Sequence, residues 1–250
     1  MDPPGAFVVP VRALLFYVGY TVATVVWGTL GTVFGWLFPY RLRFRLIIGC
    51  WTGFCLRWLR WTCGIGYRVE GLEHVPETPC IVLCRHESTW ETLFLQQLFS
   101  PQATLIKKEL LNIPFFGWAF RTLKPIAIDR SQQRKALRTL IELGSSRLDD
   151  GIWVVLFPEG TRMPAGRIGR FQPGGAALAS ATGAPVLIVV HNAGSHWPAH
   201  AFRKRAGEVQ VLIGEPIATA GRSTKEIQAD CAAHFEALMA RLPRPEADRA

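Results

Sequence analysis

The fold is decided by the stretch Cys80-Ile-Val-Leu-Cys-Arg-His-Glu-Ser-Thr-Trp-Glu91. Its apolar part, residues 81–84, is short and predicts a buried strand. Polar residues follow at once, and the pattern from Ser88 to Glu91 is typical of the start of a helix. A strand that turns directly into a helix is the basic unit of an α/β domain. Functional residues collect where such strands end, so His86 is the first candidate for a catalytic group.

The same alternation continues along the chain. Six further apolar runs predict strands at 67–69, 104–106, 125–128, 153–157, 186–190 and 209–213. Apolar residues at helical spacing predict helices at 89–98, 134–148 and 227–242. We therefore expect an α/β domain over residues 66–242, with a mixed, largely parallel sheet flanked by helices. The polar, proline-containing residues 243–250 predict a disordered tail.

An N-terminal membrane motif is predicted for residues 1–65. No charged residue occurs between Arg12 and Arg41, and this apolar stretch is long enough to cross a bilayer. It is too long for the core of a signal peptide, and no small-residue cleavage site follows it. Arginines follow directly at 41, 43 and 45, so the positive-inside rule predicts that the following domain faces the cytoplasm.

A second apolar run, residues 46–56, is too short to span a membrane. Arg57 and Arg60 accompany it, and tryptophans are interleaved, which predicts a helix lying in the membrane interface. Together the two runs form a two-helix membrane motif. The alternative is a pair of core helices in a soluble protein. The sequence leaves open whether the first helix spans the bilayer or enters and returns.

Composition narrows the class of partner. Hydrophobic residues make up 49% of the 250-residue chain, nine residues are tryptophan, and the formal net charge is +9. Such a basic, apolar chain suits anionic lipid head groups, phosphate substrates or nucleic acid. Because the arginines cluster beside apolar runs and no nucleic-acid-binding motif occurs, we expect no nucleic-acid partner.

Six cysteines occur without a C-x-x-C pair, so we expect buried, reduced thiols. Cys80, Cys84 and His86 lack a second pair of ligands, and we predict no metal site. Trp90 occupies the position of the second histidine in an H-E-x-x-H motif, which excludes a zinc-protease site of that type.

His86 and Glu91 are a candidate base and orienting group. With His86 in the turn before the helix, the Glu91 carboxylate can reach back to the imidazole. It would then fix the tautomer and stabilise the imidazolium. The alternative is that Glu91 only caps the helix, since Ser88 and Glu91 have the spacing of a capping box.

A second strand end, Phe157-Pro-Glu-Gly-Thr-Arg162, is also rich in polar groups. Gly160 permits unusual backbone angles, so that N–H groups can converge on an anion, and Thr161 adds a hydroxyl. Arg162 offers a bidentate fork to phosphate, and Glu159 could accept a hydrogen bond from a substrate hydroxyl. The alternative is an ordinary surface turn with an Arg–Glu pair.

A basic residue follows each of two more predicted strands. Lys107 follows the strand at 104–106, and Arg130 follows the strand at 125–128. Because the ends of parallel strands meet at one edge of a sheet, these cations could surround a phosphate together with Arg162. Ordinary solvated charge is the alternative, above all for Lys108 and Asp129.

Taken together, these segments resemble the bacterial type of lysophosphatidic acid acyltransferase (1-acylglycerol-3-phosphate O-acyltransferase), within the glycerolipid acyltransferases. The motifs that carry the resemblance are His86 to Glu91, Lys107-Lys-Glu-Leu110 with Pro114-Phe-Phe-Gly117, Phe157 to Arg162, and Ala184-Pro-Val-Leu-Ile-Val-Val190. They occur in order between residues 70 and 214. Two positions depart from the family pattern: Glu91 stands where an aspartate is usual, and Ile188 stands where a second proline is common.

The resemblance implies acyl transfer from acyl-CoA or acyl-carrier protein to the 2-hydroxyl of 1-acylglycerol 3-phosphate, giving phosphatidic acid. It implies that His86 is the general base and Glu91 its orienting carboxylate. It implies a bacterial inner-membrane enzyme acting on a membrane lipid, with its catalytic domain facing the cytoplasm and with no metal or redox cofactor. The residues expected to bind the acceptor are Lys107, Arg130, Glu159, Gly160, Thr161 and Arg162.

Other functions remain open at this point. The same chemistry could serve another acceptor, such as glycerol 3-phosphate or another lysophospholipid. An acyl-enzyme route is disfavoured because no G-x-S-x-G motif occurs. A non-catalytic basic membrane protein is the alternative from a different class.

Overall fold

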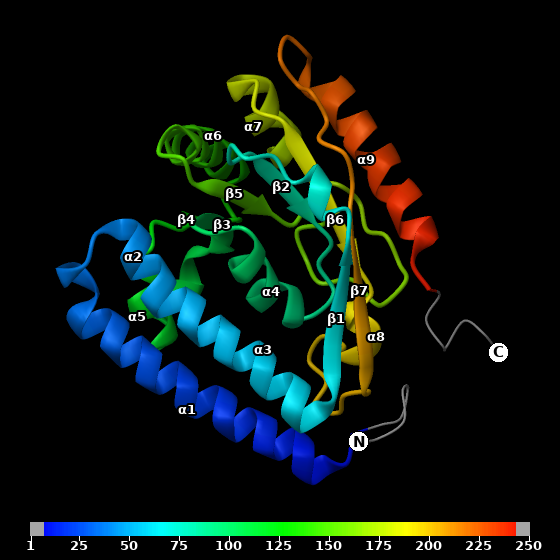
Figure 1. Ribbon diagram of the computed structural model, residues 1–250. Coiled ribbons are helices and arrows are strands. Elements are labelled where there is room, and N and C mark those ends of the chain that lie inside the picture. Colours follow the sequence, from blue (N-terminus) through cyan, green and yellow to red (C-terminus); the bar gives the residue numbers. More distant parts are fainter. Residues whose placement is uncertain (1–7, 244–250) are drawn as a thin grey trace.

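Seven strands form one sheet in the order β1-β7-β6-β2-β5-β3-β4 in the computed structural model, which describes residues 8–243 (Figure 1). Neighbouring strands run parallel, except that β6 and β7 are antiparallel. The predicted mixed, largely parallel sheet is confirmed, and each predicted strand is present. The strands are β1 Ile65–Glu70, β2 Ile81–Cys84, β3 Gln102–Lys107, β4 Ile126–Ile128, β5 Trp153–Leu156, β6 Val186–His191 and β7 Gly207–Ile213.

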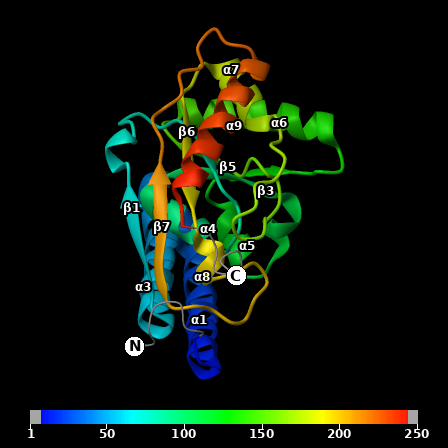
Figure 2. The ribbon, with the colours of Figure 1, turned by 90° about the vertical axis from the view of Figure 1, so that its right-hand side faces the viewer.

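Helices cover both faces of the sheet (Figures 1 and 2). One face carries α6, α7 and α9, and the other carries α3, α4 and α1. Because a largely parallel sheet is buried on both sides, alternate residues of β2 feed two cores: Val82 faces α4, and Leu83 faces α7. The helices are α1 Pro10–Phe34, α2 Tyr40–Phe44, α3 Cys50–Cys63, α4 Trp90–Leu98, α5 Phe116–Arg121, α6 Gln133–Asp149, α7 Gly174–Thr182, α8 Ala193–His196 and α9 Thr224–Arg241.

The three helices predicted in the α/β part are confirmed as α4, α6 and α9, whereas α5, α7 and α8 were not predicted. α7 begins with Gly174 and Gly175, which are poor helix formers. A Cβ added at Gly175 would lie 2.6 Å from the side chain of Leu83, so the glycine allows the helix to approach the sheet. The predicted disordered tail lies outside the described residues beyond Pro243.

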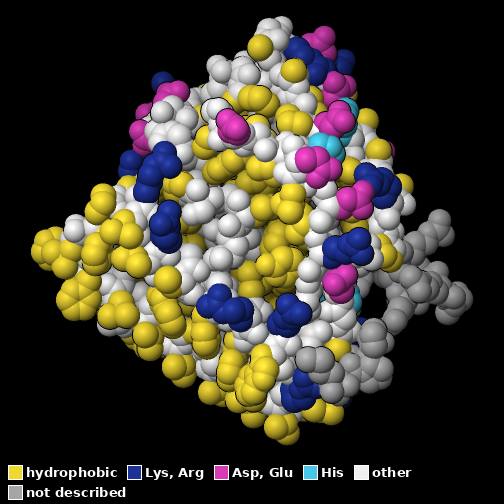
Figure 3. Space-filling view, in the orientation of Figure 1, with side chains coloured by type: hydrophobic (Ala, Val, Ile, Leu, Met, Phe, Trp, Pro, Cys, Tyr) yellow, Lys and Arg dark blue, Asp and Glu magenta, His cyan; other side chains and the backbone are white. Residues whose placement is uncertain are grey.

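α1 exposes most of its apolar side chains, which form a continuous surface along one edge of the molecule (Figure 3). In the described part of the chain, one helical segment, Pro10–Leu37, is long and apolar enough to cross a membrane. Only 22% of its most apolar window is buried. A large exposed apolar surface of this kind marks a membrane or protein contact, so α1 differs from an ordinary core helix.

α3 lies between α1 and α4. Trp51 donates a hydrogen bond to Thr24 of α1 over 3.1 Å, and Trp58 donates one to the carbonyl of Leu15 over 3.2 Å. The prediction of an interfacial helix is therefore wrong for the apolar side of α3, which is buried inside the protein. Its polar side agrees better with the prediction, because Arg57, Arg60 and Trp61 are exposed.

None of the six cysteines, all within residues 8–243, forms a disulfide. Five are buried as expected, and burial raises the pKa of Cys55, Cys80 and Cys231 to about 12, so these thiols are unreactive. Cys50 departs from the prediction, because it is exposed at the start of α3.

Lys204 joins the loop after α8 to the first helix. Its amine lies 3.8 Å from the ring centre of Tyr17 and 4.8 Å from the ring centres of both Phe16 and Trp197. The residue is fully buried, and burial lowers its pKa to about 8. The three aromatic rings hold the amine by cation–π attraction, so this contact fixes the start of α1 against the α/β domain.

A pH-dependent stability follows from this lysine. Because the pKa of Lys204 is lower in the folded protein than the value of 10.5 in an unfolded chain, folding carries a cost while both states bind the proton. That cost is fully present below about pH 8 and is relieved as the pH rises toward 10.5.

We therefore expect the wild type to gain stability relative to Lys204→Met when the pH is raised from 7 to 10. Thermal unfolding of both proteins in the same detergent measures the difference in Tm. Cysteines and tyrosines that titrate in this range are common to both proteins and cancel. A difference in Tm that is independent of pH would contradict the assignment.

Candidate active site

His86 lies in the turn after β2, and its ring stacks on Phe157 with centroids 4.1 Å apart. The ring Nδ1 lies 2.8 Å from Oε1 of Glu91, and the histidine side chain is 15% exposed. A buried carboxylate at this distance accepts the Nδ1 proton, which fixes the tautomer. Nε2 then carries the free lone pair that a general base needs.

Glu91 combines the two roles that the sequence left open. Its Oε1 also accepts the backbone N–H groups of Glu87 and Ser88, over 3.1 and 2.9 Å. The other half of a capping box is not formed, because the Ser88 hydroxyl accepts from Trp90 N–H rather than from Glu91. Glu91 therefore ties down the turn and the imidazole with the same oxygen.

Glu159 is buried between the two strand ends. Its Oε2 accepts the backbone N–H of His86 over 3.1 Å, and its Oε1 accepts that of Gly169 over 2.9 Å. Both oxygens are thus engaged by the protein. Glu159 thus connects the turn at His86 to the loop at Gly169, and it is not among the residues that line the active-site cavity described below. Its hydrogen bond to a substrate hydroxyl stays a prediction.

The Gly160 turn has the predicted left-handed backbone, with φ of +69°. Its N–H donates to the carbonyl of Phe157 over 3.0 Å, so this donor is used by the turn and does not serve an anion as expected. The carbonyl of Gly160 accepts a hydrogen bond from Arg130. Arg162 donates through Nε to the carbonyl of Ser88 over 3.1 Å, which links the turn to the start of α4.

One cavity of about 590 Å³ joins these groups. It reaches from His86 to the Gly160 turn and continues inward between α4, β3 and the first helices. Its polar mouth is lined by His86, Lys107, Arg130, Gly160, Thr161 and Arg162, and its apolar wall includes Trp51, Leu93, Ile113, Phe116 and Phe120. Three cations beside an imidazole, with an apolar space behind them, suit an anionic amphiphile.

Arg85 is a site residue that the sequence reasoning missed. It is fully buried, and its Nε donates to Glu87 over 2.7 Å. Its Nη2 donates to the carbonyls of Pro164 and Arg167, over 3.2 and 3.0 Å. Arg85 therefore joins the end of β2 to the loop that follows the Gly160 turn. The signal was present in the sequence, because an arginine and a glutamate flank His86 at the end of a buried strand.

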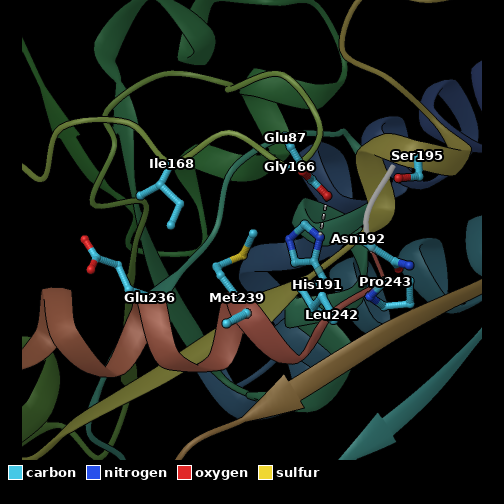
Figure 4. A pocket seen from close by; sticks show the side chains of 11 residues that line it. Glu87, Gly166, Ile168, His191, Asn192, Ser195, Glu236, Met239, Leu242 and Pro243 are labelled. Carbon is cyan, nitrogen blue, oxygen red and sulfur yellow. Dashed lines mark ion pairs between the residues drawn. The ribbon is translucent and has the colours of Figure 1, made fainter. Parts of the chain in front are cut away.

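A second cavity, of about 530 Å³, lies beside the C-terminal half of α9 and the end of β6 (Figure 4). At its floor Nδ1 of His191 lies 3.5 Å from Oε1 of Glu87, the contact drawn dashed in Figure 4. Burial opposes charge on both groups, yet their mutual hydrogen bond and attraction lower the pKa of Glu87 and help to raise that of His191. Nε2 of His191 also lies 3.9 Å from Oε2 of Glu91, so Glu91 lies between the imidazoles of His86 and His191.

Within residues 8–243, no group of three or more His, Cys, Asp or Glu side chains is arranged to hold a metal ion.

Comparison with known proteins shows the family to which the chain belongs. The family model named Acyltransferase matches residues 66–192. A 1-acyl-sn-glycerol-3-phosphate acyltransferase of Pseudomonas aeruginosa is 46% identical over 217 residues, which cover 87% of this chain and 84% of that protein. An enzyme of the same name from Cocos nucifera is 30% identical, over 84% of this chain and 67% of its own.

A solved structure is also similar. The crystal structure of the 1-acyl-sn-glycerophosphate (LPA) acyltransferase PlsC from Thermotoga maritima superimposes with a TM-score of 0.73 at 26% identity, and the match covers 94% of this chain and 97% of that one. The sequence motifs, the fold and these relatives agree. This chain belongs to the acyltransferase family and is an enzyme that transfers acyl groups.

Proposed function

We propose that this acyltransferase moves an acyl chain from acyl-CoA or acyl-carrier protein to the 2-hydroxyl of 1-acylglycerol 3-phosphate, making phosphatidic acid. The names of its relatives support this acceptor. The observation that carries the proposal is the single cavity in which a carboxylate-bound imidazole, three cations and an apolar wall meet.

The proposed chemistry follows from the geometry of His86. Nε2 takes the proton of the 2-hydroxyl while the oxygen attacks the thioester carbonyl, and a tetrahedral oxyanion forms. When the C–S bond breaks, the imidazolium returns its proton to the leaving thiolate, so no proton is gained or lost overall. Glu91 stabilises the imidazolium through Nδ1. The thioester is already an activated acyl donor, so the reaction as proposed calls on no metal or redox cofactor.

The acceptor phosphate is assigned to Lys107, Arg130 and Arg162, which line the mouth of the cavity. Lys107 and Lys108 offer a matched test, because they are adjacent and both exposed. Lys108 pairs with Asp129, whereas Lys107 lines the cavity.

We expect Lys107→Met to raise KM for the lysolipid by about five- to tenfold with little change in kcat, because one charge-assisted contact to phosphate is lost. Lys108→Met should leave both constants near those of the wild type. Initial rates in mixed micelles at varied mole fraction of lysolipid give both constants. Equal effects of the two substitutions would argue against a phosphate site at this mouth.

The exposed face of α1 suits a lysolipid substrate, whose acyl chain resides in the bilayer. We propose that α1 holds the cavity against the bacterial inner membrane. The arginines at 41, 43 and 45 would place the α/β domain on the cytoplasmic side, where acyl-CoA and acyl-carrier protein are found.

An acceptor panel tests the function. The purified protein is given a labelled acyl-CoA or acyl-carrier protein and, in parallel, 1-acylglycerol 3-phosphate, glycerol 3-phosphate, and lysophospholipids with choline or ethanolamine head groups. We expect labelled phosphatidic acid as the main product. Three cations favour the phosphate monoester of 1-acylglycerol 3-phosphate over the phosphodiesters of the choline and ethanolamine lysophospholipids. Faster acylation of glycerol 3-phosphate, or equal use of all the lysolipids, would overturn the choice of acceptor.

A further inference from the structure

The inner end of the active-site cavity is polar. Gln96, Gln102 and Thr104 line it, and they are 6%, 3% and 8% exposed. Nε2 of Gln102 donates to the Thr104 hydroxyl over 2.9 Å. The Oε1 atoms of Gln96 and Gln102 are both buried, and neither has a hydrogen-bond partner in the described part of the chain. Buried amide oxygens are nearly always paired in proteins, so this end of the cavity calls for a hydrogen-bond donor.

These residues lie deep along the path that starts at His86. Thr89, which precedes α4, and Thr92 and Gln96 on α4 all line the cavity at helical spacing, so a polar stripe runs about 10 Å inward along this helix. On β3, Lys107 stands at the mouth, and Gln102 lies about 16 Å further in along the strand. The glutamines therefore lie well behind the reacting atoms rather than beside them.

The depth and burial of this end decide which part of the substrates can occupy it. The pantetheine arm of the donor must leave the cavity again, because it continues into CoA or the carrier protein. The acyl chain of the donor has a free end and can terminate against buried residues. Other residues of the lining, Trp51, Phe116 and Phe120, are apolar and suit a hydrocarbon chain. The two amides therefore face the distal part of an acyl chain.

We propose that Gln96 and Gln102 form a subsite for an acyl chain that carries a hydroxyl group in its distal part. A hydroxyl donates to one amide oxygen and accepts from an amide N–H, so it satisfies groups that a plain hydrocarbon chain leaves unpaired. A site built to bond a hydroxyl discriminates against chains that lack it. This inference rests on the proposed function, because it names the donor class for the same reaction.

Matched donors test the subsite. The purified enzyme receives 1-acylglycerol 3-phosphate with hexadecanoyl-CoA or with hydroxyhexadecanoyl-CoA thioesters that carry the hydroxyl at successive distal carbons. We expect kcat/KM to favour one narrow range of hydroxyl positions over the plain chain by about fivefold or more. Gln96→Met and Gln102→Met should abolish this preference, measured in each variant as the ratio of kcat/KM for the hydroxylated donor to kcat/KM for hexadecanoyl-CoA.

A control comes from the neighbouring Gln97, which is exposed and donates to the Gly49 carbonyl and to Thr52 on α3. Gln97→Met should leave the preference for hydroxylated chains intact. If the wild type uses the plain chain as well as every hydroxylated chain, the subsite assignment is wrong, while the acceptor and the reaction stand. If no donor acylates 1-acylglycerol 3-phosphate at all, the proposed function itself fails.

Discussion

Replacing His86 by asparagine lowers kcat/KM for acyl transfer by about a thousandfold, the size expected when a general base is lost. Asparagine is planar and polar, so it can still lie against Phe157 and bond to Glu91. It has no basic nitrogen to take the proton of the acceptor hydroxyl. Radiolabelled acyl transfer to 1-acylglycerol 3-phosphate measures the loss, and thermal unfolding shows that the variant is folded.

His234 provides the matched control. It is exposed on α9, where its Nδ1 bonds to the carbonyl of Asp230, and it does not line the active-site cavity. His234→Asn should keep wild-type kcat/KM. A folded His86→Asn protein that retains more than about a tenth of the activity would contradict the role of His86 as the base.

Replacing Glu91 by glutamine lowers kcat by about a hundredfold or more and changes stability little. The amide oxygen still accepts the N–H groups of Glu87 and Ser88, so the turn before α4 is kept. What is lost is the negative charge that stabilises the imidazolium after proton transfer. Initial rates at saturating acceptor, together with the Tm of the same protein, measure the two effects separately.

Glu226 is the control for the effect of helix capping alone on Tm and kcat. It forms a complete capping box with Ser223 at the start of α9, on the opposite face of the sheet from α4. Glu226→Gln should lower the Tm slightly and leave kcat unchanged. If Glu91→Gln behaves in the same way, with a small change in Tm and kcat within about threefold of wild type, then Glu91 is a cap and nothing more.

The sheet could be predicted from the sequence because its strands are short apolar runs separated by clear breaks. The apolar runs at 81–84 and 153–157 are too short for helices and are bounded by polar or turn-forming residues, so they predict buried strands. Since parallel strands end at one edge of a sheet, the sequence also predicted that four groups lie near one another: His86, Lys107, Arg130 and the Gly160 turn. In the structure these residues line one cavity, as expected for groups at the ends of neighbouring parallel strands.

The sequence could not give the partner of a side chain where that partner belongs to a distant segment. Glu159 reads as a free carboxylate in a turn, yet Gly169 and the backbone of His86 enclose it. Nothing in the local sequence reveals those two partners. α3 was misplaced for a similar reason, because an apolar helix flanked by arginines looks the same whether lipid or α1 covers its apolar side.

The buried amides of Gln96 and Gln102 could not be predicted from the sequence either. Gln96 lies on a helix whose stripe of apolar residues had already explained the segment, and Gln102 opens a strand. The two amides come to one cavity only in the folded protein, where α4 and β3 both contribute to its lining. A pattern of apolar residues does not account for buried polar groups of this kind, because their burial depends on tertiary packing.

The most direct measurement is a structure of the enzyme with 1-acylglycerol 3-phosphate and a non-reactive thioether analogue of the acyl donor. The account predicts the acceptor 2-hydroxyl about 3 Å from Nε2 of His86, with the phosphate on Lys107, Arg130 and Arg162. A lysolipid whose phosphate lies in the cavity beside α9, or whose hydroxyl is turned away from His86, would contradict it.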